Sequence, residues 1–151
     1  MFQRLISEVE ISRQAALLIN TNNNLNSKII PARILSNKKE YIIETTYHTV
    51  TACVKIERQS YNMSEIKHLV VKPSCRKLGL AKKLVSEGLK RSTTPIVYAT
   101  VREDNIPSQK VFQSCGFINT GKYTTGNKVI LIYSSTSPKW KSKLDNSYYR
   151  A

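Results

Sequence analysis

The sequence predicts an α+β fold in which helices surround one central sheet. Three observations support this class. An amphipathic helix comes first, runs of β-branched and aromatic residues follow it, and strand and helix signals then alternate before two last strands. A chain of 151 residues is long enough for one domain with its own core. We assign residues 1–135 to a single domain and residues 136–151 to a basic, flexible C-terminal tail.

The first third of the domain begins with a helix signal. Residues 7–10, SEVE, are typical of a capping box, with a serine at the N-cap and a glutamate three positions later. We expect this helix to continue to about Asn20 and a polar loop to cover residues 21–28. Residues 29–35 are apolar but contain Pro31, which lacks a backbone donor. We predict an edge strand or an extended connection there.

Six short runs are rich in the residues that strands favour. The first two are close enough to pair as a hairpin, and the last two flank a Gly126-Asn127 turn. The predicted strands are residues 41–47, 50–58, 63–71, 95–101, 117–124 and 129–133.

Two more helices are expected in the second half of the chain. Apolar residues recur about every four positions from Leu80, which predicts a helix over residues 79–91. Pro73 ends the strand before it, so the basic loop between them lies at a helix N-terminus, where free N–H groups and the helix dipole favour an anion. The other helix is expected to begin at Asn105, a capping residue, and to end at Gly116.

The charge balance is strongly basic. The chain has 24 Lys and Arg residues against 10 Asp and Glu residues, a formal net charge of +14. This excess favours contact with nucleic acid or another polyanion, and the tail over residues 139–150 adds aromatic residues that can stack on bases. Charge alone does not specify a ligand, so solubility and one phosphorylated cofactor remain an alternative explanation.

Cysteine usage and hydropathy suggest where the protein works. Cys53, Cys75 and Cys115 are odd in number and widely spaced, which argues against a disulfide framework and against a metal cluster. We therefore expect a reducing, cytoplasmic compartment and no metal. No apolar run approaches the ~20 residues that span a bilayer, and the N-terminus lacks the pattern of a signal peptide. No membrane association is predicted.

Two short motifs lie at the starts of the two later helices. Residues 76–81, RKLGLA, fit the pattern Gln/Arg-x-x-Gly-x-Gly/Ala, and residues 105–108, NIPS, are followed by Gly116-Phe117. In this order and on these elements, the motifs resemble the GNAT superfamily of acetyl-CoA-dependent N-acetyltransferases over residues 64–133. The resemblance implies three layers, with a mixed, mostly antiparallel sheet between helices, and acetyl-CoA as the acetyl donor.

The resemblance also implies which residues bind the donor. The loop would hold the diphosphate with backbone N–H groups, and Gly79 lets the backbone approach closely. Pantetheine would pair with the backbone of residues 69–71, where an amide can polarise the thioester carbonyl. Asn105 caps its helix, contacts pantetheine or does both, and Lys110 meets the 3′-phosphate or is simply exposed. The predicted binding residues are Leu69, Val70, Val71, Arg76, Lys77, Leu78, Gly79, Leu80, Ala81, Lys82, Asn105, Ser108, Lys110 and Phe112.

Glu65 is the candidate general base. An acceptor ammonium, with a pKa of about 10.4 for a lysine side chain, must lose a proton before it can attack. Glu65 lies roughly 20 Å before Val71 along an extended strand, which is comparable with a pantetheine arm. Some family members carry a glutamate eleven residues before the first loop position, as Glu65 stands before Arg76. A solvated glutamate at a strand start is the alternative. His68 is a second candidate, but it faces away from Glu65 unless a β-bulge intervenes.

The general acid is less clear from the motifs. Many family members have a tyrosine where this chain has Phe112, which cannot donate a proton. A thiol leaves at a pKa near 8.5 and needs little protonation. Tyr123 is the candidate acid, with Tyr98 or a water as alternatives. An acyl-cysteine route is not favoured, because no base lies near Cys75 or Cys115 in the sequence.

Two functions are compatible with these features. The first is an N-acetyltransferase that passes acetyl directly from acetyl-CoA to a primary amine of an acidic or nucleic-acid-associated acceptor, with Glu44 and Glu57 as possible acceptor-binding carboxylates. The alternative is a catalytically silent GNAT-like module that binds nucleic acid through its basic surface, and Phe112 is its main support. The intact phosphate loop favours the enzyme.

Overall fold

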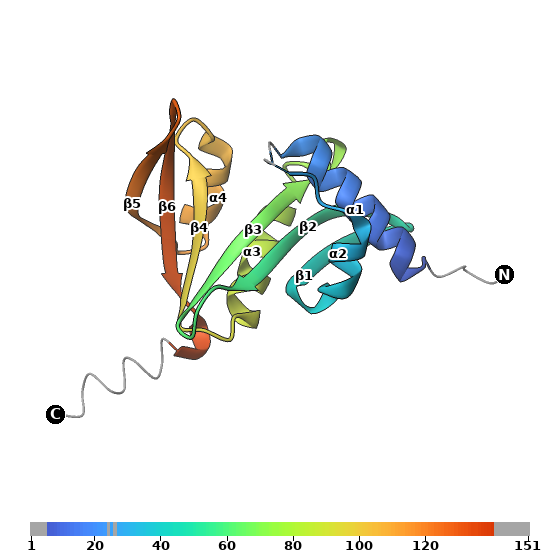
Figure 1. Cartoon of the computed structure of the whole chain (residues 1–151), viewed down its shortest axis with the longest axis horizontal. Helices are drawn as coiled ribbons and strands as arrows, with labels where there is room; N and C mark the ends of the chain where they lie inside the picture. The colour runs from blue at the N-terminus through green and yellow to red at the C-terminus, as the bar shows by residue number, and fades with distance from the viewer. Residues whose placement is uncertain (1–5, 24, 26, 141–151) are drawn as a thin grey trace.

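A six-stranded sheet lies between two layers of helices in the computed structural model, which describes residues 6–23, 25 and 27–140 (Figure 1). Its strands are β1 (Tyr41–Thr46), β2 (Thr49–Arg58), β3 (Met63–Val71), β4 (Ile96–Arg102), β5 (Ile118–Thr125) and β6 (Lys128–Thr136). They are ordered β1-β2-β3-β4-β6-β5, and every neighbouring pair is antiparallel except β3 and β4. The predicted α+β class with a mixed, mostly antiparallel sheet is confirmed.

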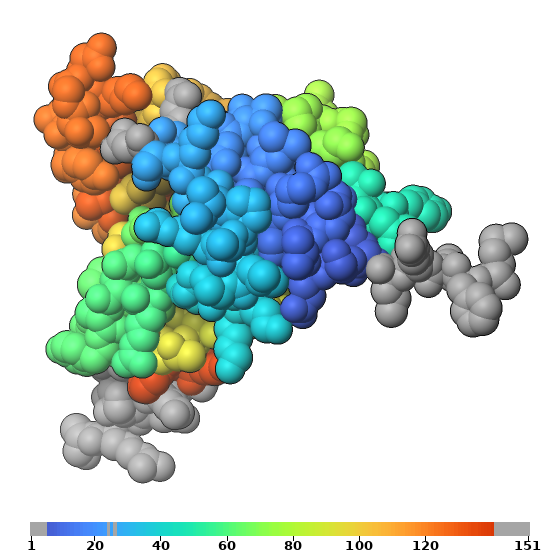
Figure 2. All heavy atoms as spheres, turned by 45° about the vertical axis from the view of Figure 1, so that its right-hand side comes forward, coloured from blue at the N-terminus to red at the C-terminus, as the bar shows by residue number. Residues whose placement is uncertain are grey.

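The helices divide between the two faces of the sheet. Helices α1 (Glu8–Asn22) and α2 (Pro31–Ser36) cover one face of the first three strands, and Figure 2 shows them on the near side, apart from the β5–β6 hairpin. Helices α3 (Leu80–Arg91) and α4 (Ile106–Ser114) pack on the opposite face, over the larger apolar core. The 3-10 turns η1 (Lys38–Glu40) and η2 (Pro73–Cys75) complete the elements.

One predicted element of the N-terminal third is wrong. The helix α1 begins as expected, since Ser7 Oγ accepts a hydrogen bond from the Glu10 backbone N–H at 3.1 Å. Residues 29–35, however, were expected to be extended, and residues 31–36 instead form α2. Pro31 occupies the start of this helix, where its missing N–H breaks no bond. Ile34, only 1% exposed, then packs in the core beneath α1.

The strands β3 and β4 pair at one end only and diverge toward the other (Figure 1). Residues 63–65 of β3 lie opposite residues 96–98 of β4. From Ile66 onward, within the described residues, the edge of β3 that faces β4 has no partner strand. The divergence therefore leaves unpaired backbone groups along β3, which are strong hydrogen-bonding groups in need of a partner.

Buried hydroxyl groups fasten the closed end of this divergence. Ser64 Oγ of β3 lies 2.7 Å from Thr94 Oγ1, and Thr94 Oγ1 donates to the Ile96 carbonyl at 3.0 Å. Ser92 Oγ accepts from the Thr94 backbone N–H at 3.2 Å. All three hydroxyl residues are at most 1% exposed. These bonds connect the end of α3 to both strands and so fix the point from which β3 and β4 separate.

A β-bulge interrupts β3 at His68. Lys67 pairs with Lys55 of β2, but Val70 pairs with Cys53, so His68 and Leu69 both lie opposite one residue of β2. His68 has φ of +54°, in the left-handed region that non-glycine residues rarely adopt. The bulge reverses the alternation, so Val70 packs toward α1 while Leu69 packs toward α3.

The domain continues into the segment predicted as a tail. β6 ends at Thr136, and Ser137 is fully buried, with its hydroxyl donating to the Leu89 carbonyl at 3.2 Å. The first two residues of the predicted tail, 136–151, are thus part of the folded sheet region. Residues 141–151, with most of its basic and aromatic residues, lie outside the described residues. Among the described helices, none has the length and apolar character needed to cross a membrane.

We predict that Thr94→Val lowers the free energy of unfolding by about 1–3 kcal/mol, because it leaves the Ser64 hydroxyl without its buried partner. Urea unfolding followed by circular dichroism measures this. The control is Thr93→Val, at the exposed neighbouring position. Equal effects of the two substitutions would show that the buried hydroxyl cluster does not stabilise the fold.

Candidate active site

A groove of about 660 Å³ lies beside the divergent end of β3, between that strand and the N-terminal ends of α3 and α4. All but three of the predicted donor-binding residues line it, the exceptions being Leu78, Lys110 and Phe112. The sequence did not single out five further lining residues. They are Asn22, Asn23, Cys75, Pro107 and Val111. Asn22 and Asn23 at the end of α1 and Val111 of α4 reach the groove only through packing, whereas Cys75 and Pro107 lie beside or within the two motifs.

The loop before α3 has the geometry of an anion site. Lys77 and Gly79 have φ of +67° and +79°, and Gly79 is the N-cap of the helix. A Cβ at Gly79 would meet no atom within 4 Å, so the space in front of this turn is open. Within the described residues, the backbone N–H groups of residues 78–82 donate to no protein acceptor. Such groups at a helix N-terminus suit a phosphate.

Cations surround the mouth of this loop unequally. Arg76 Nε donates to the Val71 carbonyl at 3.3 Å, which holds the guanidinium against the end of β3. Lys77 and Lys82 also line the groove, and neither forms an ion pair with another of the described residues. Lys83 is different, because its Nζ lies 2.8 Å from Glu44 Oε1 of β1. Glu44, a possible acceptor-binding carboxylate in the sequence, is therefore occupied by a lysine.

The start of α4 contributes a cap rather than a charge. Asn105 Oδ1 accepts from the Ser108 backbone N–H at 3.2 Å, and both residues line the groove. Lys110 is exposed and outside the groove. Phe112 is only 4% exposed and stacks edge-on against Phe117, with ring centroids 5.2 Å apart. Phe112 is therefore a core residue and does not reach the groove.

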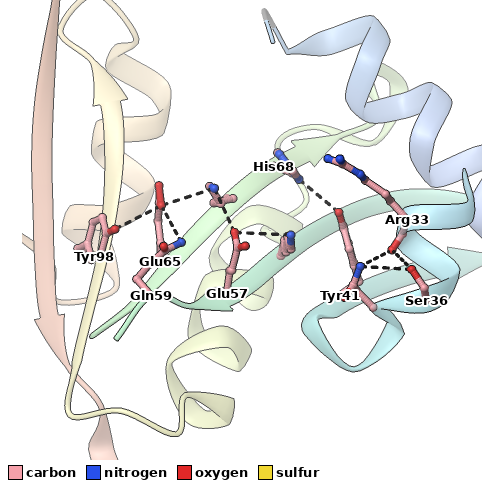
Figure 3. A network of polar contacts seen from close by, with 11 residues as sticks. Arg33, Ser36, Tyr41, Glu57, Gln59, Glu65, His68 and Tyr98 are labelled. Carbon is pink, nitrogen blue, oxygen red and sulfur yellow. Dashed lines mark hydrogen bonds and ion pairs between the residues drawn. The ribbon is translucent and has the colours of Figure 1, made fainter. Parts of the chain in front are cut away.

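Glu65 lies at the closed end of the divergence, on the sheet face that carries α1 and α2 (Figure 3). Its Oε1 accepts from Gln59 Nε2 at 3.3 Å and from the Tyr98 hydroxyl at 3.4 Å, and Lys67 Nζ lies 3.8 Å away. The side chain is 14% exposed. Burial raises the pKa of Glu65 despite the Lys67 charge, which makes this carboxylate a better proton acceptor than an ordinary glutamate.

The two tyrosines proposed as general acids are placed differently. Tyr98 of β4 contacts Glu65, and burial together with the Glu65 charge raises the pKa of the Tyr98 hydroxyl. Tyr123 lies on β5, is 46% exposed and stands opposite Ile130 of the hairpin. Tyr98, and not Tyr123, is thus the tyrosine that the structure brings to Glu65.

His68 faces the same side of the sheet as Glu65 because of the bulge (Figure 3). Its Nδ1 lies 3.5 Å from the Tyr41 hydroxyl. Burial, and then the charges of Lys55 and Lys67, lower the pKa of His68 to about 4. The imidazole is therefore neutral at pH 7 but a weak base. His48 is exposed in the β1–β2 turn.

The cysteines occupy three different environments. Burial raises the pKa of Cys53 to about 12, so this thiol is inert. Cys75 lines the groove, and Cys115 Sγ lies 3.6 Å from the Lys82 carbonyl. No group of His, Cys, Asp and Glu suited to a metal ion is found in the part of the chain that the structure describes.

Solved structures of acetyltransferases share this fold. Ard1 from Thermoplasma volcanium has a TM-score of 0.69 at 18% identity, covering 88% of this chain and 95% of that one. The putative acetyltransferase yncA from Salmonella typhimurium, with its cofactor acetyl-CoA, has a TM-score of 0.71 at 13% identity, covering 90% and 93%. A ribosomal-protein-alanine N-acetyltransferase from Brucella melitensis has a TM-score of 0.70 at 13% identity, covering 90% and 99%. No curated protein matches the sequence.

The sequence itself identifies the family. Residues 33–117, which are 85 of the 151 residues, match the acetyltransferase (GNAT) family, and the chain belongs to it. The resemblance seen in the two motifs is confirmed, and so is the prediction of an acetyl-CoA-dependent acyltransferase.

We predict that His68→Asn makes stability less dependent on pH between 6.5 and 4. The pKa of His68 is about 4 in the folded state and 6.5 ordinarily, so the unfolded chain binds the proton first. The stability from keeping His68 neutral is complete above pH 6.5 and is lost as the pH falls to 4. Asparagine tolerates the left-handed backbone that both histidines adopt. Urea unfolding across this range should show the change for His68→Asn and not for His48→Asn, and identical slopes would contradict it.

Proposed function

We propose that the protein is an N-acetyltransferase that passes acetyl directly from acetyl-CoA to a primary amine, with Glu65 as the general base. One observation supports this most strongly. The groove begins at the open N–H groups of residues 78–82 and continues along the unpaired edge of β3. That same strand carries Glu65 at the other end of its unpaired stretch.

The residues of the groove divide the task of binding the donor. Backbone N–H groups at the start of α3 would hold the diphosphate of acetyl-CoA, with Arg76, Lys77 and Lys82 supplying opposite charge. The backbone of residues 69–71, which has no partner strand on the edge facing β4, would hydrogen-bond the pantetheine as an added strand. Acetyl-CoA supplies an activated thioester whose thiol is a good leaving group.

Glu65 and the side chains near it would then accept and transfer the proton of the acceptor amine. A carboxylate with a raised pKa accepts a proton from an incoming ammonium more readily, which yields the neutral amine that attacks the thioester carbonyl. A backbone N–H of β3 beside the bulge would stabilise the developing oxyanion. Tyr98 is the nearest hydroxyl to this carboxylate and can relay or return the proton, in place of the absent tyrosine at Phe112.

The acceptor is proposed to carry an acidic group or to be associated with nucleic acid. Arg33 of α2 extends toward Tyr41 and His68 (Figure 3). Its charge acts to lower the pKa of the Tyr41 hydroxyl, against the larger effect of burial. No carboxylate among the described residues forms an ion pair with Arg33. A cation at the edge of the site favours an acceptor with a carboxylate or phosphate near its amine.

An acetyl-CoA-dependent mass-shift screen tests the acceptor class, using matched amines with and without an acidic group, basic peptides and aminoacylated RNA. Faster acetylation of the acidic member of each pair, weakened by salt, supports the proposal. Binding of labelled RNA without acetylation of any acceptor would instead favour the silent module.

We predict that Gly79→Ala weakens acetyl-CoA binding about tenfold, because a side chain disfavours the left-handed turn that aims the N–H groups at the diphosphate. Isothermal titration calorimetry measures the affinity. Gly126→Ala is the matched control, since Gly126 also has positive φ and open space but lies in the β5–β6 turn. An unchanged affinity in Gly79→Ala would refute the assigned diphosphate site.

We predict that Glu65→Gln lowers kcat at pH 7 by roughly 10²-fold, as expected on loss of a general base. Acetyl-CoA affinity should stay the same, because the diphosphate site is remote from this side chain. Steady-state kinetics and calorimetry measure the two quantities, with the exposed Glu103→Gln as control. A kcat within twofold of the parent enzyme would exclude Glu65 as the base.

A further inference from the structure

Four charged side chains form a square on β2 and β3, on the sheet face that carries α1 and α2. Glu57 lies directly opposite Glu65 in the antiparallel register. Lys55 lies directly opposite Lys67 one step further along. Like charges thus face each other across the strands at both positions, an arrangement that destabilises a sheet. Exchanging one glutamate with one lysine would give opposite charges across both pairs, so stability alone does not account for this order.

The ion pairs within the square are unequal. Lys67 Nζ lies 3.0 Å from Glu57 Oε2 but 3.8 Å from Glu65 Oε1. Lys55 Nζ also pairs with Glu57, at 3.6 Å. Glu57 therefore pairs with both lysines, whereas Glu65 has one longer lysine contact besides its hydrogen bonds from Gln59 and Tyr98. A charge-assisted bond at 3.0 Å is substantially stronger than a contact at 3.8 Å.

The two carboxylates differ accordingly. Burial opposes ionisation of Glu57, but the hydrogen bond from Lys67 and the charges of both lysines outweigh it, so the pKa of Glu57 is lowered. The pKa of Glu65 is raised. Two facing carboxylates with divergent proton affinities are typical of sites where one stays charged and the other exchanges a proton.

We propose that Glu57 is a positioning residue: it holds the Lys67 ammonium on its own carboxylate and so leaves the Glu65 carboxylate free to take the proton of the acceptor amine. This inference rests on the proposed function of Glu65. Glu57 does not touch the reacting atoms, and it acts on Glu65 through Lys67 in addition to the direct repulsion of its own charge. The charged or titratable groups that face Glu65 are Lys67 on its own strand, Glu57 on β2 and Tyr98 on β4.

The geometry predicts that the effect of Lys67 on the pKa of Glu65 depends on Glu57. Without the Glu57 carboxylate, Lys67 has Glu65 as its remaining partner on this face and moves onto it. A close lysine stabilises the ionised carboxylate and weakens it as a base. Glu57→Gln also removes a nearby negative charge, which shifts the Glu65 titration in the same direction. The effect of Lys67 must therefore be separated by a double-mutant cycle.

The experiment measures the titration of the Glu65 carboxyl by NMR in four forms: the parent protein, Lys67→Gln, Glu57→Gln and the double variant. We expect Lys67→Gln to raise the pKa of Glu65 by a small amount in the parent and by a clearly larger amount in the Glu57→Gln background. An equal effect of Lys67→Gln in both backgrounds would overturn the proposal. Because the two varied side chains, Lys67 and Glu57, are 36% and 32% exposed, all four forms should fold, and circular dichroism checks this.

Kinetics provide the second readout. Glu57→Gln should lower kcat/KM at pH 7 about three- to tenfold and move its acidic limb to lower pH, and the added Lys67→Gln should reverse both changes. Glu44→Gln is the matched control, because Glu44 also pairs with a lysine and its side chain is 30% exposed against 32% for Glu57. A pH profile that moves equally in Glu44→Gln and Glu57→Gln would contradict a specific role.

Failure of this inference differs from failure of the proposed function. If Glu65→Gln abolishes activity while the titration shows no coupling, the base assignment stands and the role of Glu57 falls. If the coupling appears but the parent protein transfers no acetyl group, the electrostatic relation is supported and the proposed function falls instead.

Discussion

The separation of β3 from β4 is the constraint on which the rest of the site depends. The two strands pair over residues 63–65 and 96–98 and then diverge. Full pairing of β3 with β4 would leave no free backbone on this edge of β3, since every N–H and C=O there would have a partner strand. The buried hydroxyls of Ser64, Ser92 and Thr94 hold the closed end, next to the last residue of β3 that pairs with β4. That residue is Glu65.

Because of the bulge at His68, the two ends of β3 present different kinds of side chain on the same face of the sheet. Before the bulge, the side chains on the sheet face that carries α1 and α2 are charged. After it, Val70 lies on that face and packs beneath α1. Simple alternation would place a Val71 side chain in line with Glu65 and Lys67. By inserting one residue, the strand buries its end in both cores while its free edge still borders the groove. The backbone can therefore serve one ligand and the side chains another.

Local signals in the sequence were sufficient for most of the fold and for the glycine turn before α3. Gly79 and the two flanking patterns identify a strand, a turn and a helix N-terminus within a few residues, and the structure places them there. The helix α2 was missed because Pro31 suits a helix start as well as an extended segment, and only packing of Ile34 decides between them. The contact of Tyr98 with Glu65 depends on a pairing between distant strands, which no single segment encodes.

The square of charges on β2 and β3 likewise depends on strand pairing that the sequence does not reveal. Each of the four residues looks like an ordinary solvated charge in the sequence, and the alternation of Lys55 with Glu57 and of Glu65 with Lys67 suggests pairs along each strand. Only the structure shows that like charges face each other across the strands and that Lys67 forms its shorter ion pair with Glu57 on the opposite strand. Because like charges lie directly opposite each other in this order, we relate its presence beside the point of divergence to the proposed role of Glu65 as the base. Here the position of one ammonium group, closer to one carboxylate than to the other, connects the register of the sheet to the chemistry of the site.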